Sequence, residues 1–100
     1  MTYDFDGKRI LVTGATSGIG AELARACAQR GAIVGICGRR GDRLDVVLAE
    51  LQESSPNSRA WTIDLSEIDA INGFAQSVLA QFGGLDVLIT TPVSQNAEPR

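Results

Sequence analysis

Short apolar runs alternate with longer helical patterns along this 100-residue chain, and the alternation constrains its fold more than any other feature. Runs rich in β-branched residues predict buried strands, and apolar residues three or four apart predict helices. The predicted strands span residues 8–13, 32–37, 59–63 and 85–90, and the predicted helices span residues 18–30, 42–53 and 66–82. Because strands and helices alternate strictly, we expect a parallel α/β sheet with right-handed crossovers and strand order 3-2-1-4.

The spacing of apolar and polar residues also predicts the buried faces and the ends of the helices. Asp42 and Ser66 are expected to cap the second and third helices, and Gly31 suits the left-handed end of the first. The expected buried residues are Ile19, Leu23 and Cys27 in the first helix, with Ala24 and Ala28 widening that face, Leu44, Val47, Leu48 and Leu51 in the second, and Ile68, Ile71, Ala75, Val78, Leu79 and Phe82 in the third.

The composition excludes several classes of protein. Hydrophobic residues make up 44% of the chain and charged residues 21%, which is ordinary for one small globular domain. The formal net charge of -3 gives no bulk attraction to nucleic acid or anionic lipid, so neither is expected as a partner. Apolar runs fall short of the roughly 18 residues that span a bilayer, and acidic residues stand where a signal peptide carries basic ones, so we expect a cytoplasmic location.

Metal and redox chemistry are not expected. The chain has no histidine, and its cysteines, Cys27 and Cys37, have the spacing of no zinc or redox motif. We expect both thiols to be small buried core residues in a reducing compartment.

A glycine-rich turn, T-G-A-T-S-G-I-G, runs from Thr13 to Gly20, where the first predicted strand ends and the first predicted helix begins. Gly14 allows a sharp turn, Gly18 allows close approach of backbone to a pyrophosphate, and Gly20 allows close packing of helix on sheet. The free N–H groups and positive dipole of the helix N-terminus favour phosphate. The alternative is a tight turn that binds no ligand.

This turn, opening such a unit, resembles that of the short-chain dehydrogenases/reductases. The resemblance covers about residues 4–89, which is nearly all of this chain but only the front half of such an enzyme. It implies a partial Rossmann-like, doubly wound α/β fold of four strands and three helices that binds NAD(P). The turn residues that it implies line the cofactor phosphates are Gly14, Ser17, Gly18, Ile19 and Gly20.

The end of the second predicted strand favours NADP over NAD. An acidic residue here would bind the adenosine ribose hydroxyls, whereas arginine accommodates a 2′-phosphate. The sequence reads C-G-R-R, with Arg39 and Arg40 and no acidic residue between Gly31 and Gly41. In similar NADP-dependent enzymes, the residue matching Arg39 grips that phosphate. The alternative is a pair of solvated arginines, and the glycine-rich turn lacks the second basic residue that some NADP-preferring members carry.

The end of the third predicted strand matches the adenine site of the family. The resemblance implies that Asp64 accepts a hydrogen bond from the adenine amino group and that the backbone N–H of Leu65 meets the ring. The residues alone leave open a second role, in which Asp64 is a turn residue leading into the Ser66 cap.

The resemblance breaks after the fourth predicted strand. Leu85 to Ile89 fit the family, but Thr90 to Val93 stand where it has Asn-Asn-Ala-Gly. The catalytic Ser and Tyr-x-x-x-Lys that the family uses are also missing, because the one tyrosine, Tyr3, and the one lysine, Lys8, are five residues apart before the first strand. We therefore name no catalytic residue and expect this chain to be inactive alone.

The break has a specific form at the level of codons. A single A inserted before the Thr90 codon allows the reading N-N-A-G-I-P-K-R-R, with permitted choices of third base. We therefore expect residues 1–89 to form a dinucleotide-binding half-domain and residues 90–100 to form an irregular tail translated out of frame. A designed fragment and a natural short protein are the alternatives.

Together these features predict the NADP-binding part of a short-chain dehydrogenase/reductase. The intact relative would transfer hydride between nicotinamide and an alcohol or carbonyl substrate. The alternative is a non-catalytic NADP-binding or interaction module. A methyltransferase front half is disfavoured because the acidic residues that such proteins carry near the turn are missing. The exposed apolar edge at residues 85–90 predicts self-association.

Overall fold

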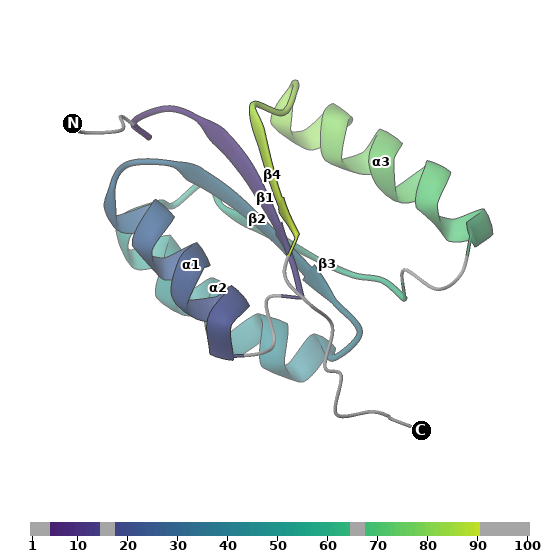
Figure 1. The fold of residues 1–100 in the computed structure, drawn as a ribbon, viewed down its shortest axis with the longest axis horizontal. Helices are drawn as coiled ribbons and strands as arrows, with labels where there is room; N and C mark the ends of the chain where they lie inside the picture. The colour runs from purple at the N-terminus through teal and green to yellow at the C-terminus, as the bar shows by residue number, and fades with distance from the viewer. Residues whose placement is uncertain (1–4, 15–17, 65–67, 91–100) are drawn as a thin grey trace.

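The computed structural model describes residues 5–14, 18–64 and 68–90. Strands and helices alternate as the sequence predicts, with most boundaries within two residues of the expected positions (Figure 1). The elements are β1 (Arg9–Thr13), α1 (Gly18–Gln29), β2 (Ile33–Gly38), α2 (Gly41–Ser54), β3 (Arg59–Thr62), α3 (Ile68–Phe82) and β4 (Val87–Thr90).

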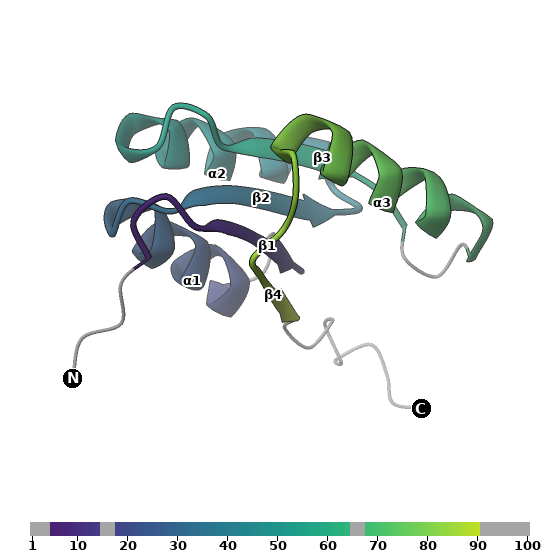
Figure 2. The same ribbon diagram turned by 90° about the horizontal axis from the view of Figure 1, so that it is seen from above.

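The four strands form one parallel sheet with the order β3-β2-β1-β4, which confirms the predicted fold class. Helices α1 and α2 cover one face of the sheet, and α3 lies on the other (Figures 1 and 2). Because all strands run the same way, their carboxyl ends meet at a single edge of the sheet. The turns that leave those ends are the segments that position the candidate site.

The main core lies between the sheet and the α1–α2 layer. Alternate residues of β1 and β2 point into it, as the two-residue period of a strand requires. The predicted face of α2 is confirmed, because Leu44, Val47 and Leu51 are buried and Leu48 packs against the cluster. The strand residues of this cluster are Ile10, Val12, Val34 and Ile36.

The predicted buried face of α1 is confirmed at its small residues and wrong at its two large ones. Ile19 is 67% exposed and Leu23 is 37% exposed, whereas Ala24, Cys27 and Ala28 are buried. Gly20 is buried on the same helix. Small side chains let the helix axis approach the strands closely, and the larger apolar side chains are left on the outer flank.

A smaller aromatic cluster lies under α3 on the opposite face. The Trp61 ring meets the rings of Phe82 and Phe74 edge-on, with centroids 5.5 and 6.0 Å apart. Gly35 of β2 makes room for it, because a Cβ there would lie 2.7 Å from Cζ3 of Trp61. Among the predicted core residues of α3 whose side chains the structure describes, Val78 alone is fully buried, while Ile71 and Leu79 remain exposed.

The ends of the helices differ in part from the predicted caps. Gly31 has φ +92° and its N–H donates to the carbonyl of Ala28, which confirms the left-handed end of α1. Arg40, not Asp42, occupies the N-cap position of α2, without a side-chain capping bond. Asp42 lies inside the first turn, where a carboxylate is stabilised by the helix dipole rather than by capping. The predicted cap Ser66 lies outside the described residues.

Both cysteines are free and buried, as the sequence predicts. Burial raises the pKa of the Cys37 thiol to about 11 and also raises the pKa of Cys27. The thiols are therefore protonated at neutral pH, and they act as small apolar core residues.

Candidate functional site

The candidate site lies at the carboxyl edge of the sheet, where the order of the strands reverses. The chain proceeds outward from β1 to β2 and β3, then returns to place β4 on the other side of β1. Helix α1 leaves β1 on one face of the sheet, and α3 approaches β4 from the other (Figure 2). Open α/β sheets bind ligands at the carboxyl end of such a strand, where adjacent crossovers lie on opposite faces.

The glycine-rich turn leaves β1 at this point. Gly14 has φ +69°, a left-handed conformation that glycine adopts without strain. Gly18 begins α1 and is exposed, and among the described residues, its chain neighbours and nearby helix backbone aside, no heavy atom lies within 4 Å of the position that a Cβ would take. Gly20 is buried against the sheet. Gly14 has the turn conformation and Gly20 the burial that the sequence predicts, whereas the approach of a pyrophosphate at Gly18 stays a prediction. Ser17 lies outside the described residues.

The N-terminus of α1 is suited to an anion. The helix is 12 residues long, and its first turn contains no acidic residue to offset the positive end of the dipole. The first N–H groups of a helix have no partner within it, so they are available to a phosphate. The exposed side chain of Ile19 stands beside them at the start of the helix.

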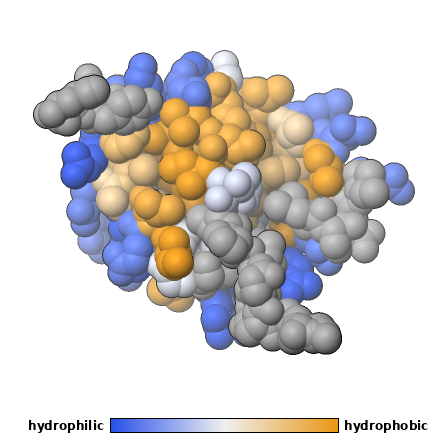
Figure 3. Space-filling model, viewed as in Figure 1, coloured by the Kyte–Doolittle hydropathy of each residue, from blue (hydrophilic) through white to orange (hydrophobic). Residues whose placement is uncertain are grey.

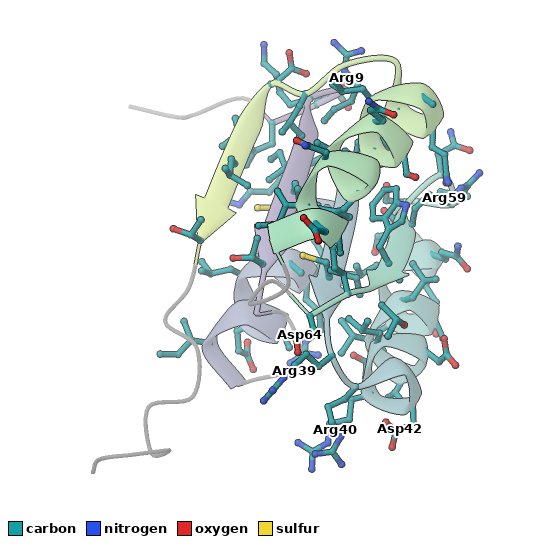
Figure 4. The ribbon with its side chains drawn as sticks, turned by 90° about the vertical axis from the view of Figure 1, so that its right-hand side faces the viewer. Arg9, Arg39, Arg40, Asp42, Arg59 and Asp64 are labelled. Atoms are coloured by element: carbon teal, nitrogen blue, oxygen red, sulfur yellow. The ribbon has the colours of Figure 1, made fainter. Side chains whose placement is uncertain are left out.

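The ends of β2 and β3 bring together the residues predicted for the adenosine part of a dinucleotide. The N–H of Ile63 donates to the carbonyl of Gly38 at 2.8 Å, so the residues that follow, Arg39 and Asp64, are neighbours across the two strands. Figure 4 shows Arg39 and Asp64 at the same end of the sheet, opposite the end that carries Arg9 and Arg59. The predicted partner of Asp64, Leu65, lies outside the described residues.

The two arginines have different surroundings. Arg40 is the N-cap residue of α2, and its Nε lies 4.0 Å from Oδ1 of Asp42. Arg39 is exposed and forms no ion pair with any residue that the structure describes. Sequence reasoning missed the Arg40–Asp42 pair. The available signal was an acidic residue two positions after the arginine, at the start of a predicted helix.

These residues fit the phosphate groups and the adenosine of a dinucleotide. Open space at Gly18, the N–H groups of α1 and the cation of Arg39 lie along the same edge of the sheet. The described residues contain no group of three or more potential metal-binding side chains. Within the same part of the chain, every helix is too short or too polar to cross a membrane.

A half-sheet with a glycine-rich turn at its switch point defines a class of dinucleotide-binding α/β proteins. A family model described as short chain dehydrogenase matches residues 8–97 of this chain. The chain belongs to the short-chain dehydrogenase family, as the glycine-rich turn predicts.

Relatives with different activities share this segment. The chain is 38% identical over 86 residues to a fatty acyl-CoA reductase of Mycobacterium tuberculosis, with 86% of this chain and 29% of the relative covered. It is 34% identical over 91 residues to D-threitol dehydrogenase of Mycolicibacterium smegmatis, with 89% of this chain and 35% of the relative covered. It is 39% identical over 90 residues to human retinol dehydrogenase 11, with 88% of this chain and 28% of the relative covered. The chain thus spans about a third of the length of these relatives.

Solved structures confirm the fold and include both cofactor types. An actinorhodin polyketide ketoreductase with NADPH matches with a TM-score of 0.78 and 35% identity, covering 85% of this chain and 33% of that one. A metagenomic short-chain oxidoreductase in complex with NADP matches with a TM-score of 0.78 and 38% identity, covering 86% of this chain and 39% of that one. An NADH-dependent reductase complexed with NAD matches with a TM-score of 0.77 and 32% identity, covering 87% of this chain and 36% of that one.

Proposed function

We propose that this chain is the cofactor-binding part of an NADP-dependent short-chain oxidoreductase. The observation that carries the proposal is the open backbone at Gly18, at the head of a helix with no acidic residue in its first turn. The exposed guanidinium of Arg39 at the same edge of the sheet, which has no ion-pair partner among the described residues, supports the choice of NADP over NAD.

Each part of the cofactor has a named partner in this proposal. The N–H groups at the start of α1 bind the pyrophosphate, with Gly18 giving the room for close approach. Arg39 binds the 2′-phosphate through charge-assisted hydrogen bonds, and Asp64 accepts from the adenine amino group. When bound, the nicotinamide exchanges a hydride with an alcohol or carbonyl carbon. This chain holds and orients the cofactor, and we assign it no proton-transfer residue.

The test is calorimetric titration of the 100-residue chain with NADP⁺ and with NAD⁺. We expect NADP⁺ to bind more tightly, by roughly ten-fold or more, because hydrogen bonds between charged groups contribute about 1.5–3 kcal/mol. Arg39→Ala removes this preference and leaves NAD⁺ affinity unchanged. Arg59→Ala is the matched control, because it removes the same charge at the opposite end of the sheet (Figure 4).

Equal affinities for the two cofactors in the unmodified chain would contradict the NADP assignment. A preference that survives Arg39→Ala, or that Arg59→Ala abolishes equally, would contradict the role of Arg39. The alternative function is a non-catalytic NADP-binding module, and it uses the same site. It is favoured if NADP⁺ changes the activity of a partner protein while the chain itself supports no hydride transfer.

The partner proposed for the sheet edge is a second copy of this chain. Figure 3 shows hydrophobic surface gathered over β4, where the free edge of the sheet faces the viewer. Leu88 in that strand is 56% exposed, and Leu85 before it is 36% exposed. Among the described residues β4 pairs only with β1, so its outer backbone groups are open to another strand.

Two further expectations stay predictions. One is the cytoplasmic location. The other is the division of the chain at residue 90, with residues 90–100 translated out of frame. The coding DNA decides the second, because restoring one base near the Thr90 codon should open a frame that encodes a Ser and then Tyr-x-x-x-Lys.

A further inference from the structure

The end of β2 carries two arginines, and they differ in what lies beside them. Arg40 has a carboxylate partner, because its Nε is 4.0 Å from Oδ1 of Asp42. Arg39 has no such partner among the residues that the structure describes. Figure 4 shows Arg40 and Asp42 extending from the start of α2, whereas Arg39 lies by Asp64.

The charge of Asp42 is favoured by the dipole of α2 as well as by the guanidinium of Arg40. Asp42 lies in the first turn of α2, where the positive end of the helix dipole favours a carboxylate. Its side chain is 77% exposed and that of Arg40 is 59% exposed, so solvent screens the pair. Asp42 therefore places a negative charge beside Arg40, in the region where a dianionic phosphate would approach that guanidinium.

We propose that Asp42 competes with the 2′-phosphate of the cofactor for Arg40 and so limits the preference of this site for NADP. The proposal rests on the cofactor function proposed above. Arg39 carries most of the 2′-phosphate contact, and Arg40 contributes little while Asp42 is charged. NAD has no phosphate at this position, so its affinity does not depend on Asp42.

The direct test is Asp42→Asn, which removes the charge and keeps the shape of the side chain. We expect NADP⁺ to bind about two- to five-fold more tightly, the range that exposed ion pairs reach, and NAD⁺ to bind as before. Adenosine 2′,5′-bisphosphate and adenosine 5′-monophosphate are the matched small probes, and they should show the same contrast by calorimetry. The gain should shrink as salt rises above about 0.15 M, where the screening length is near 8 Å.

The matched control is Glu53→Gln near the other end of α2. It makes the same change in net charge, and eleven residues of helix place it about 16 Å further along the axis, beyond the screening length. We expect Glu53→Gln to leave both affinities unchanged. Equal tightening of NADP⁺ in the two variants would overturn the proposal, because it would show a general effect of net charge.

A double-mutant cycle separates two effects of Asp42: competition with the cofactor for Arg40, and direct electrostatic repulsion of the cofactor by the Asp42 charge. Arg40→Ala should lower NADP⁺ affinity less than two-fold in the unmodified chain but about two- to five-fold in the Asp42→Asn background. The Arg40→Ala substitution leaves the helix cap intact, because the Arg40 side chain makes no capping hydrogen bond. Strict additivity of the two substitutions would overturn the proposal.

The outcomes also distinguish this proposal from the function on which it rests. If NADP⁺ binds more tightly than NAD⁺ but Asp42→Asn changes neither affinity, the role of Asp42 is wrong and the cofactor function stands. If Asp42→Asn shifts both cofactors equally, competition at the 2′-phosphate is wrong. If neither cofactor binds to the unmodified chain, both proposals are overturned together.

Discussion

At the scale of single residues, glycines divide into those that serve the fold and those that serve the site. Gly35 serves the fold, since a Cβ there would lie 2.7 Å from the Trp61 ring and about 3 Å from the Phe82 ring. Gly18 is different, because a Cβ there would meet only open space. The sequence predicts a phosphate-binding role for Gly18 from its place in the turn, and that role stays a prediction. It gave no comparable signal for Gly35, whose neighbours come from β3 and α3.

The two glycines should respond oppositely to alanine. Gly35→Ala overpacks the aromatic cluster, so we expect a loss of about 1–3 kcal/mol in the free energy of unfolding. Gly18→Ala should leave that free energy unchanged or raise it by up to about 1 kcal/mol, because alanine favours helix. The same Gly18→Ala chain should lose at least about ten-fold in NADP⁺ affinity, since close approach of the pyrophosphate is blocked.

Denaturant titration and calorimetry on the two variants check these expectations. A Gly18→Ala chain that binds NADP⁺ as the unmodified chain does would show that the open space at this turn is not the phosphate site. A Gly35→Ala chain of full stability would show that Trp61 can move away without cost.

At the scale of elements, the sequence predicted which strands and helices exist, their order and their pairing, because the two-residue and 3.6-residue periods are local. It predicted α2 well, because its single stripe of large apolar residues is buried against β2, β3 and α1. It was right on the small residues of α1, Ala24, Cys27 and Ala28, but wrong on Ile19 and Leu23, because the period assigns large apolar residues to the same face. It overestimated α3 because a period predicts an apolar face but not the layer that covers it.

The start of β4 is fixed by a contact that no local pattern reveals. Asp86 accepts hydrogen bonds from the backbone N–H of Arg9 at 2.8 Å and from its Nε at 3.2 Å. The N–H of Asp86 in turn donates to the carbonyl of Arg9 at 2.9 Å. These contacts join residues 77 positions apart, and they attach the last strand to the first.

This contact should make the stability of the chain depend on pH. The backbone N–H and then the side chain of Arg9 lower the pKa of Asp86 below its usual value. A lowered pKa stabilises the folded chain above the pKa of the unfolded state, near 3.9, and this contribution is lost as pH falls through the lower folded value. We expect the stability difference between the unmodified chain and Asp86→Asn to be constant near neutral pH and to shrink below about pH 4.

Denaturant midpoints of the two chains, measured from neutral pH down to about pH 3, give this difference directly. Asp69→Asn is the control, because it removes the same charge in the first turn of α3. A difference between the unmodified chain and Asp86→Asn that does not change with pH would contradict the role of the carboxylate.

At the scale of the whole molecule, β3 and β4 are the two edge strands of the described sheet, and β4 has no charged residue. Parallel sheets are ordinarily covered on both faces. Here α3 leaves β4 uncovered on its face of the sheet (Figure 4). The large exposed hydrophobic residues are Ile19, Leu23, Ile71, Leu79, Leu85, Leu88 and Val46, and all except Val46 lie on α1, α3 or the β4 segment.

We expect the isolated 100-residue chain to self-associate through this edge. The segment from Val87 to Thr90 contains no charge, proline or bulge to prevent strand pairing. Sedimentation at tens of micromolar should therefore give a mass above 10.6 kDa that falls on dilution. Leu88→Lys places a charge on the open strand and should return the mass to that of a monomer, whereas Val46→Lys on α2 should not. A monomer at every concentration, or equal effects of the two lysines, would show that β4 is not the contact surface.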